Sequence, residues 1–173
     1  DPKDYVPRTL GWELSRRGKL PPAESLGLML DLASALQWLH RHGLIHRDIK
    51  PSNIIYVRGA PKLADIGLVT PMAGTGRDVT SVRTVGYAAP EGPGTPAADV
   101  FSLGKVLYET MLGQDPELFR EWPTPMAGED PPPLLSELNR VLGVACDQDA
   151  SQRYPTAGAM RVGLERIKER FEI

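Results

Sequence analysis

The chain has 173 residues, which is enough for one domain that buries a sizeable core. Its 20 Lys and Arg side chains nearly balance its 22 Asp and Glu side chains, so it lacks the basic surplus of a nucleic-acid-binding protein. The single cysteine excludes an internal disulfide and favours a reducing, cytoplasmic compartment, and no apolar run approaches the ~20 residues of a membrane-spanning helix.

Residues 1–20 are predicted to form an extended lead-in and one short helix. The helix follows from the apolar positions Leu10, Trp12 and Leu14, and it should end near Gly18 because glycine commonly terminates helices. The first residue is an aspartate rather than methionine. We therefore expect the chain to be a piece of a longer protein, and a membrane anchor elsewhere in that protein stays open.

The longest predicted helix begins at the prolines of residues 21–22 and ends before Gly43. Its apolar residues recur on one helical face: Leu28, Leu32, Leu36 and Leu39. His40 and His42 fall in the last turn, where a cationic side chain suits the helix dipole. We favour this role over metal binding, because no neighbouring carboxylate or cysteine completes a metal site.

The loop after this helix reads HRDIKPSN at residues 46–53, which places an acid, a base and an amide close together. The three groups are Asp48, Lys50 and Asn53. A carboxylate, an ammonium group and a carboxamide can together hold a hydroxyl nucleophile, a phosphate and a metal ion. This loop is therefore the first candidate for a catalytic site.

A β-hairpin is predicted next, with strands at 54–57 and 62–64 joined by a turn at 58–61. The hairpin brings Asn53 at its entrance close to Asp65 at its exit. An oxygen ligand from each of these residues suits a magnesium ion.

The remaining elements are a long loop and three helices. Residues 67–91 are rich in Gly and Thr and predict a long loop that is either functional or disordered. Helices are predicted over 99–112, 134–146 and 156–171, and the proline-rich stretch between the first two carries a helical turn near 116–121.

Taken in order, these motifs resemble the landmarks of the protein kinase family. The loop at 46–53 resembles the kinase catalytic loop in the Lys-bearing form of Ser/Thr kinases, and DIG at 65–67 resembles the metal-binding motif. APE at 89–91 resembles the motif that closes the activation segment. DVFSLG at 99–104 is similar to the start of the central helix of the larger lobe.

The resemblance implies a mainly α fold, namely a kinase-like C-terminal lobe in which a helical bundle and a small β-hairpin carry the catalytic and metal-binding loops. Residues 1–20 would be the hinge-side segment and a short helix, and 21–64 the long helix, catalytic loop and hairpin. Residues 65–91 would be the activation segment, and 92–173 a helical subdomain. The N-terminal lobe is expected to be absent, because no glycine-rich phosphate loop and no Lys-bearing strand precede the catalytic loop.

The resemblance also implies roles for individual residues. Asp48 would be the catalytic base, Lys50 would neutralise charge on the transferred phosphoryl group, and Thr84 would bond to both. Asn53 and Asp65 would hold Mg²⁺. The residues expected to contact MgATP are Lys50, Asn53, Ile55 and Asp65.

Further residues would hold the fold. Glu91 is expected to form a buried ion pair with Arg153, and Asp99 to anchor the backbone of the catalytic loop. Asp99 also has a plain interpretation as the N-cap of its helix. His46 would pack against Ile66, which replaces the usual phenylalanine.

The activation segment carries the regulatory candidates. Thr80 and Ser81 are candidate phosphorylation sites, because Arg47 could pair with a phosphate there; an ordinary solvated loop is the alternative. Gly67 completes the metal-binding motif, and Arg83 replaces the glycine that usually precedes the threonine.

The leading hypothesis is the C-lobe portion of a Ser/Thr protein kinase. The intact parent would transfer the γ-phosphate of MgATP to protein Ser or Thr hydroxyls, and this chain alone would be inactive without the N-terminal lobe. The short connection at 92–98 favours a bacterial kinase. Expected partners are the missing lobe and the protein substrate, with neither nucleic acid nor membrane contacted by this segment.

Two alternatives remain. A truncated, non-catalytic kinase-like scaffold would bind a substrate or a true kinase. A small-molecule kinase would share the Asp, Asn and metal-binding carboxylate, but Lys50 and the APE motif at 89–91 argue against it.

Overall fold

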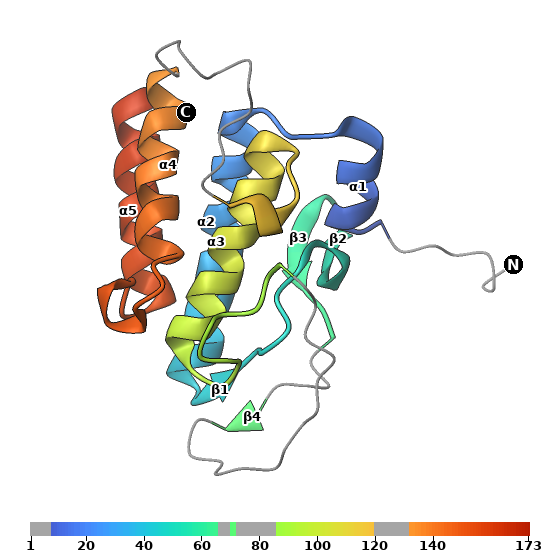
Figure 1. Ribbon diagram of the computed structural model, residues 1–173. Coiled ribbons are helices and arrows are strands. Elements are labelled where there is room, and N and C mark those ends of the chain that lie inside the picture. Colours follow the sequence, from blue (N-terminus) through green and yellow to red (C-terminus); the bar gives the residue numbers. More distant parts are fainter. Residues whose placement is uncertain (1–7, 66–69, 72–85, 120–131) are drawn as a thin grey trace, which may run out of the picture.

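The computed structural model describes residues 8–65, 70–71, 86–119 and 132–173. Most of these residues are helical, which confirms the predicted mainly α fold with a small hairpin (Figure 1). The described elements are, in chain order, α1 (Leu10–Arg17), α2 (Pro22–Arg41), β1 (Leu44–Ile45), β2 (Ile54–Val57), β3 (Ala60–Leu63), β4 (Thr70–Pro71), α3 (Pro96–Leu112), α4 (Pro133–Ala145) and α5 (Ala157–Phe171). Short 3₁₀ turns lie at Pro51–Asn53, Pro116–Leu118 and Ala150–Gln152.

The helices form a bundle around α2 and α3. Figure 1 shows α4 and α5 side by side on one flank, and α1 with the β2–β3 hairpin on the other. The core lies between these layers and is apolar: its fully buried side chains include Leu32, Leu36, Leu103, Leu107 and Leu164. The regularly spaced apolar side chains of the helices therefore face the core, as predicted. Among the described residues, no helix is long and apolar enough to cross a membrane.

Most predicted helix ends are confirmed within a residue or two. α1 ends at Gly18, whose φ of 73° favours glycine, and α2 covers the long apolar stretch. α3 begins three residues earlier than predicted, because Pro96 occupies its first turn and the Thr95 hydroxyl accepts from the Ala98 backbone N–H. The N-cap of α3 is therefore Thr95, and the plain N-cap interpretation of Asp99 is wrong.

The predicted hairpin is confirmed, but its turn is shorter than expected. Arg58 and Gly59 alone make the turn, with φ of 52° and 83°. Positive φ at both central residues is typical of a two-residue turn that matches the strand twist. Pro61 lies within β3, opposite Tyr56, rather than in the turn. Pro is tolerated there because β3 is an edge strand.

A second pair of short strands was not predicted. β1 lies antiparallel to β4, with Leu44 opposite Pro71 and Ile45 opposite Thr70. A strand of two residues has no periodicity to detect, so only the tertiary structure reveals it. The pairing ties the segment after Asp65 to the chain just before the catalytic loop.

Candidate active site

Asp99 anchors the loop at 46–53 from α3. Its side chain is buried, Oδ2 accepts from the His46 backbone N–H at 2.9 Å, and Oδ1 accepts from the Arg47 backbone N–H at 2.9 Å. The ring Nε2 of His40 lies 2.9 Å from the same Oδ2. A carboxylate only accepts here, so Nε2 of His40 carries the proton. Asp99 thus satisfies two backbone donors and one ring donor with a single buried charge.

This anchoring holds the loop in a conformation that it would not adopt alone. Arg47 has a φ of 71°, in the left-handed region that a long side chain rarely occupies. Such strain persists only where surrounding contacts fix it, and the bond from Arg47 N–H to Asp99 is one of them.

The His46 ring joins the loop to the hairpin. Its Nε2 lies 3.1 Å from the Ala64 carbonyl oxygen, and its Nδ1 lies 3.4 Å from the Asp48 backbone N–H. A carbonyl can only accept and an N–H can only donate, so the ring is placed as the Nε2–H tautomer. The buried ring therefore fixes the backbone at Asp48 relative to the residue that precedes Asp65.

Three of the predicted site residues meet at the Asp48 carboxylate. Lys50 Nζ lies 2.8 Å from Asp48 Oδ2, and Asn53 Nδ2 donates to the same oxygen at 2.8 Å and to the Asp48 carbonyl at 2.9 Å. Asn53 takes its position from the 3₁₀ turn Pro51–Asn53, which Pro51 begins with its fixed φ. Acid, base and amide thus share one side of the loop.

The donor set fits a hard divalent cation. Asn53 uses its amide nitrogen for Asp48, which leaves the amide oxygen as its metal-binding atom. The Ala64 backbone N–H donates to the Asn53 carbonyl at 2.8 Å, so Asp65 follows directly on the residue that pairs with Asn53. The Asp65 side chain is exposed, and its φ of 59° turns the chain away from β3.

No cluster of three or more His, Cys, Asp and Glu suited to a metal occurs among the described residues. Mg²⁺ bound by one or two protein oxygens, phosphates and water requires no such cluster.

The predicted Glu91–Arg153 pair is present, but it is buried on the Arg153 side only, because the Glu91 side chain is 33% exposed. Arg153 donates to both oxygens of Glu91, at 2.6 and 2.9 Å, and its side chain is fully buried. The guanidinium also lies 4.8 Å from the centre of the Phe101 ring. The hydrogen bonds from Arg153 hold the pKa of the Glu91 carboxyl below its usual value.

Comparison with known proteins agrees with this geometry. The protein kinase domain family matches residues 3–123. The chain belongs to the protein kinase family. This kinase chain is 36% identical over 172 residues to the serine/threonine-protein kinase PknB of Mycolicibacterium smegmatis, covering 88% of the chain and 27% of that protein. PknB of Mycobacterium tuberculosis is 35% identical over 170 residues, with 87% of the chain and 27% of that protein covered.

A third relative is the serine/threonine-protein kinase PknL of Mycobacterium tuberculosis, which is 34% identical over 185 residues. That match covers 95% of the kinase chain and 46% of PknL. The kinase chain thus spans about a quarter of the length of the PknB proteins and less than half of PknL.

Several predicted residues of this kinase chain cannot be placed. Ile66, Gly67, Thr80, Ser81 and Thr84 lie outside the described residues. Ile55, expected to contact the nucleotide, is half-buried in β2 and forms an isolated antiparallel bridge with Thr9.

Two contacts were not predicted. His40 lies in the last turn of α2, as predicted, but its contact with Asp99 was not expected. The second contact is that of Tyr87, whose hydroxyl donates to the Glu109 carboxylate on α3. Burial raises the pKa of both Tyr87 and Glu109.

Only the position of Tyr87 just before the APE motif could have singled it out. Neither contact has a local sequence signal, since the partners of His40 and Tyr87 lie 59 and 22 residues away.

Proposed function

We propose that the chain is the C-terminal lobe of a bacterial Ser/Thr protein kinase whose parent transfers the γ-phosphate of MgATP to protein Ser or Thr hydroxyls. The observation that carries this proposal is the cluster at the Asp48 carboxylate, where Lys50 and Asn53 each lie 2.8 Å from Oδ2. The parent would act in the cytoplasm. Its N-terminal lobe would supply the phosphate-binding loop and the second lysine that the reaction needs.

In this proposal Asp48 orients the substrate hydroxyl and accepts its proton as the oxygen attacks phosphorus. Lys50 is held beside Asp48 by their ion pair, where its ammonium group can stabilise the charge that develops on the phosphoryl oxygens. Positioning and electrostatics supply most of the catalysis in phosphoryl transfer, so the rigid anchoring of the loop by Asp99 matters directly.

Mg²⁺ would be held by the side-chain oxygens of Asn53 and Asp65. When bound, the ion neutralises charge on the nucleotide phosphates. Asn53 has a second task, because its amide nitrogen fixes the Asp48 carboxylate. Thr84 would complete the site by bonding to Asp48 and Lys50, and Thr80 or Ser81 would take a regulatory phosphate beside Arg47.

The decisive test is Asp48→Asn in the full-length parent protein. Loss of the general base should lower phosphate transfer to a Ser/Thr-containing test protein by at least ~100-fold. The exposed Asp31 on α2 provides a matched control, since Asp31→Asn makes the same chemical change away from the site. Unchanged transfer by the Asp48 variant would refute the role of this carboxylate.

A second measurement uses the 173-residue chain alone. It should show weak ATP binding by calorimetry and no phosphate transfer, because it lacks the phosphate-binding elements of the other lobe. Robust phosphorylation of a test protein by the isolated chain would contradict the proposal that this segment is one lobe of the catalytic unit.

A further inference from the structure

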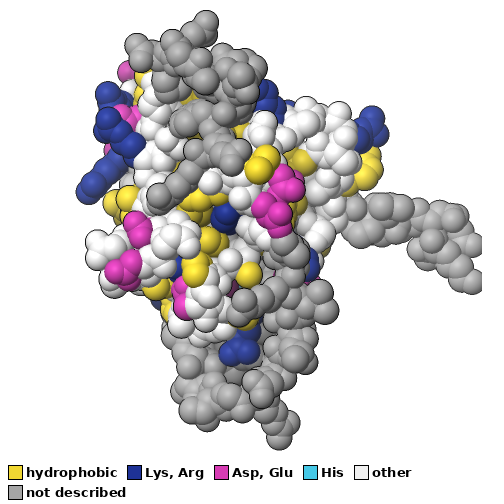
Figure 2. Space-filling view, viewed as in Figure 1, with side chains coloured by type: hydrophobic (Ala, Val, Ile, Leu, Met, Phe, Trp, Pro, Cys, Tyr) yellow, Lys and Arg dark blue, Asp and Glu magenta, His cyan; other side chains and the backbone are white. Residues whose placement is uncertain are grey.

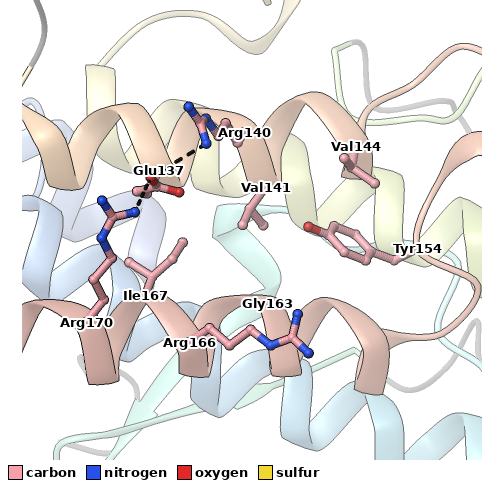
Figure 3. A pocket seen from close by; sticks show the side chains of 9 residues that line it. All are labelled: Glu137, Arg140, Val141, Val144, Tyr154, Gly163, Arg166, Ile167 and Arg170. Carbon is pink, nitrogen blue, oxygen red and sulfur yellow. Dashed lines mark hydrogen bonds and ion pairs between the residues drawn. The ribbon is translucent and has the colours of Figure 1, made fainter.

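A groove runs between α4 and α5 on the flank of the bundle. Its cavity volume is about 280 Å³. Both helices contribute residues at the spacing i, i+3, i+4 and i+7, which defines one helical face: Glu137, Arg140, Val141 and Val144 on α4, and Gly163, Arg166, Ile167 and Arg170 on α5. Figure 3 shows Tyr154 reaching in from the loop that precedes α5.

The floor of the groove is apolar. Val141 on α4 and Ile167 on α5 lie across the groove from each other and are each 5% exposed, whereas Val144 is 39% exposed and lies at its edge (Figure 3). Gly163 leaves room for the Tyr154 side chain, because a Cβ there would come within 3.3 Å of the Tyr154 hydroxyl oxygen, closer than an ordinary contact. Among the described residues no hydrogen bond involves that hydroxyl, so it is available as a donor inside the groove.

The rim is positively charged. Three arginines accompany one glutamate, and Glu137 is already engaged: its Oε1 lies 2.6 Å from Arg170 Nη1 and 3.7 Å from Arg140 Nη1 (Figure 3). Arg166 forms no ion pair or hydrogen bond with another residue in the described ranges. The space-filling view shows Lys and Arg side chains on the upper part of the edge formed by α4 and α5, with Asp and Glu side chains beside and below them (Figure 2). The chain as a whole carries a net charge of −2, so this positive rim is a local feature.

The size of the groove favours a protein segment over a small molecule as its ligand. Small-molecule pockets usually enclose ~300–1,000 Å³, and about 280 Å³ suits one or two side chains of a segment that continues over the surface. A membrane surface would require several apolar side chains that project outward, whereas of the three aliphatic side chains that line the groove only Val144 is exposed. An aliphatic side chain next to a carboxylate matches both the floor and the rim.

We propose that the α4–α5 groove is a docking site for an acidic protein segment that carries an aliphatic side chain. The aliphatic side chain packs on Val141 and Ile167, and an adjacent carboxylate accepts from Arg166 and from the Tyr154 hydroxyl. The contacts are independent of phosphate transfer, so the groove can be tested whether or not the parent is an active kinase.

The test begins with selection of random twelve-residue peptides displayed on phage against the full 173-residue chain. The selected peptides should carry Asp or Glu within two residues of Leu, Ile or Val. One such peptide, labelled with fluorescein, is then titrated with the chain and followed by fluorescence anisotropy. Arg166→Glu should weaken its binding at least tenfold, because a charge in contact with the carboxylate is reversed.

Lys168→Glu is the matched control, because it makes the same charge reversal on the same helix at an exposed residue outside the groove, and it should change binding less than twofold. Circular dichroism of both variants checks that the helix content of the chain is unchanged. Selected peptides without the acidic and aliphatic pair, or equal binding to the Arg166 and Lys168 variants, would overturn the proposal. Arg166-dependent binding of phosphatidylserine vesicles, with no peptide binding, would overturn it as well.

Discussion

Removal of Glu91 should destabilise the fold more than removal of a carboxylate whose cationic partner is exposed. Glu91→Ala leaves the guanidinium of Arg153 fully buried without its counter-charge. Breaking a buried pair from one side costs ~3–5 kcal/mol. Arg153 keeps backbone acceptors at Asp147 (2.7 Å), Ala97 (3.2 Å) and Gln148 (3.4 Å). The Glu91 side chain is also 33% exposed, so we expect the lower end, about 3 kcal/mol.

Urea denaturation at pH 7, followed by circular dichroism, measures this loss as a change in the free energy of unfolding. For a chain of this size it corresponds to a melting temperature lower by roughly 6–12 °C.

The matched control is Glu24→Ala. Glu24 also forms a two-bond pair, with Arg17 at 2.7 and 2.6 Å, but the two side chains are 44% and 36% exposed. Water can solvate Arg17 when Glu24 is removed, so the cost should stay below ~1 kcal/mol. Equal destabilisation by Glu91→Ala and Glu24→Ala would refute the reasoning, because burial would then not decide the energy of the pair.

The remaining predictions concern pH, packing and the anchored loop. The pKa of Glu91 is lowered in the folded state, so its pair with Arg153 stabilises the fold above about pH 4.5, and this stability should be lost as the pH falls further. Urea denaturation curves recorded over a series of pH values measure this loss. In the Glu91→Gln variant the free energy of unfolding should depend less on pH in that range. Gly104→Ala should cost about 1–3 kcal/mol, because its Cβ would lie 2.5 Å from Cys146 Sγ. Adding Cys146→Ala should restore part of that loss, and no restoration would contradict the proposed clash. Asp99→Ala should cost about 2–5 kcal/mol, since it orphans backbone N–H groups in the loop; a loss within 0.5 kcal/mol, as at an ordinary surface site, would contradict its anchoring role.

The candidate site was predictable in part because its residues are close in the chain. Asp48, Lys50 and Asn53 lie within one loop, so local geometry already brings them together. A short hairpin then returns the chain to Asn53 at Ala64, the residue before Asp65. The contact between His40 and Asp99 was not predictable from local pattern, since it crosses from α2 to α3.

The sequence by itself determined the local elements and the residues that could do chemistry. Helical and strand periodicity, prolines in first turns and glycines at helix ends act on near neighbours, so they can be read along the chain. The tertiary structure alone decided which charges are buried and which stay in water. It buries Asp99 and Arg153 and leaves Arg166 exposed at the rim of the α4–α5 groove. The reason is physical: the cost of a charge depends on what packs around it. Those neighbours are distant in the chain, 53 residues apart for His46 and Asp99 and 62 for Glu91 and Arg153.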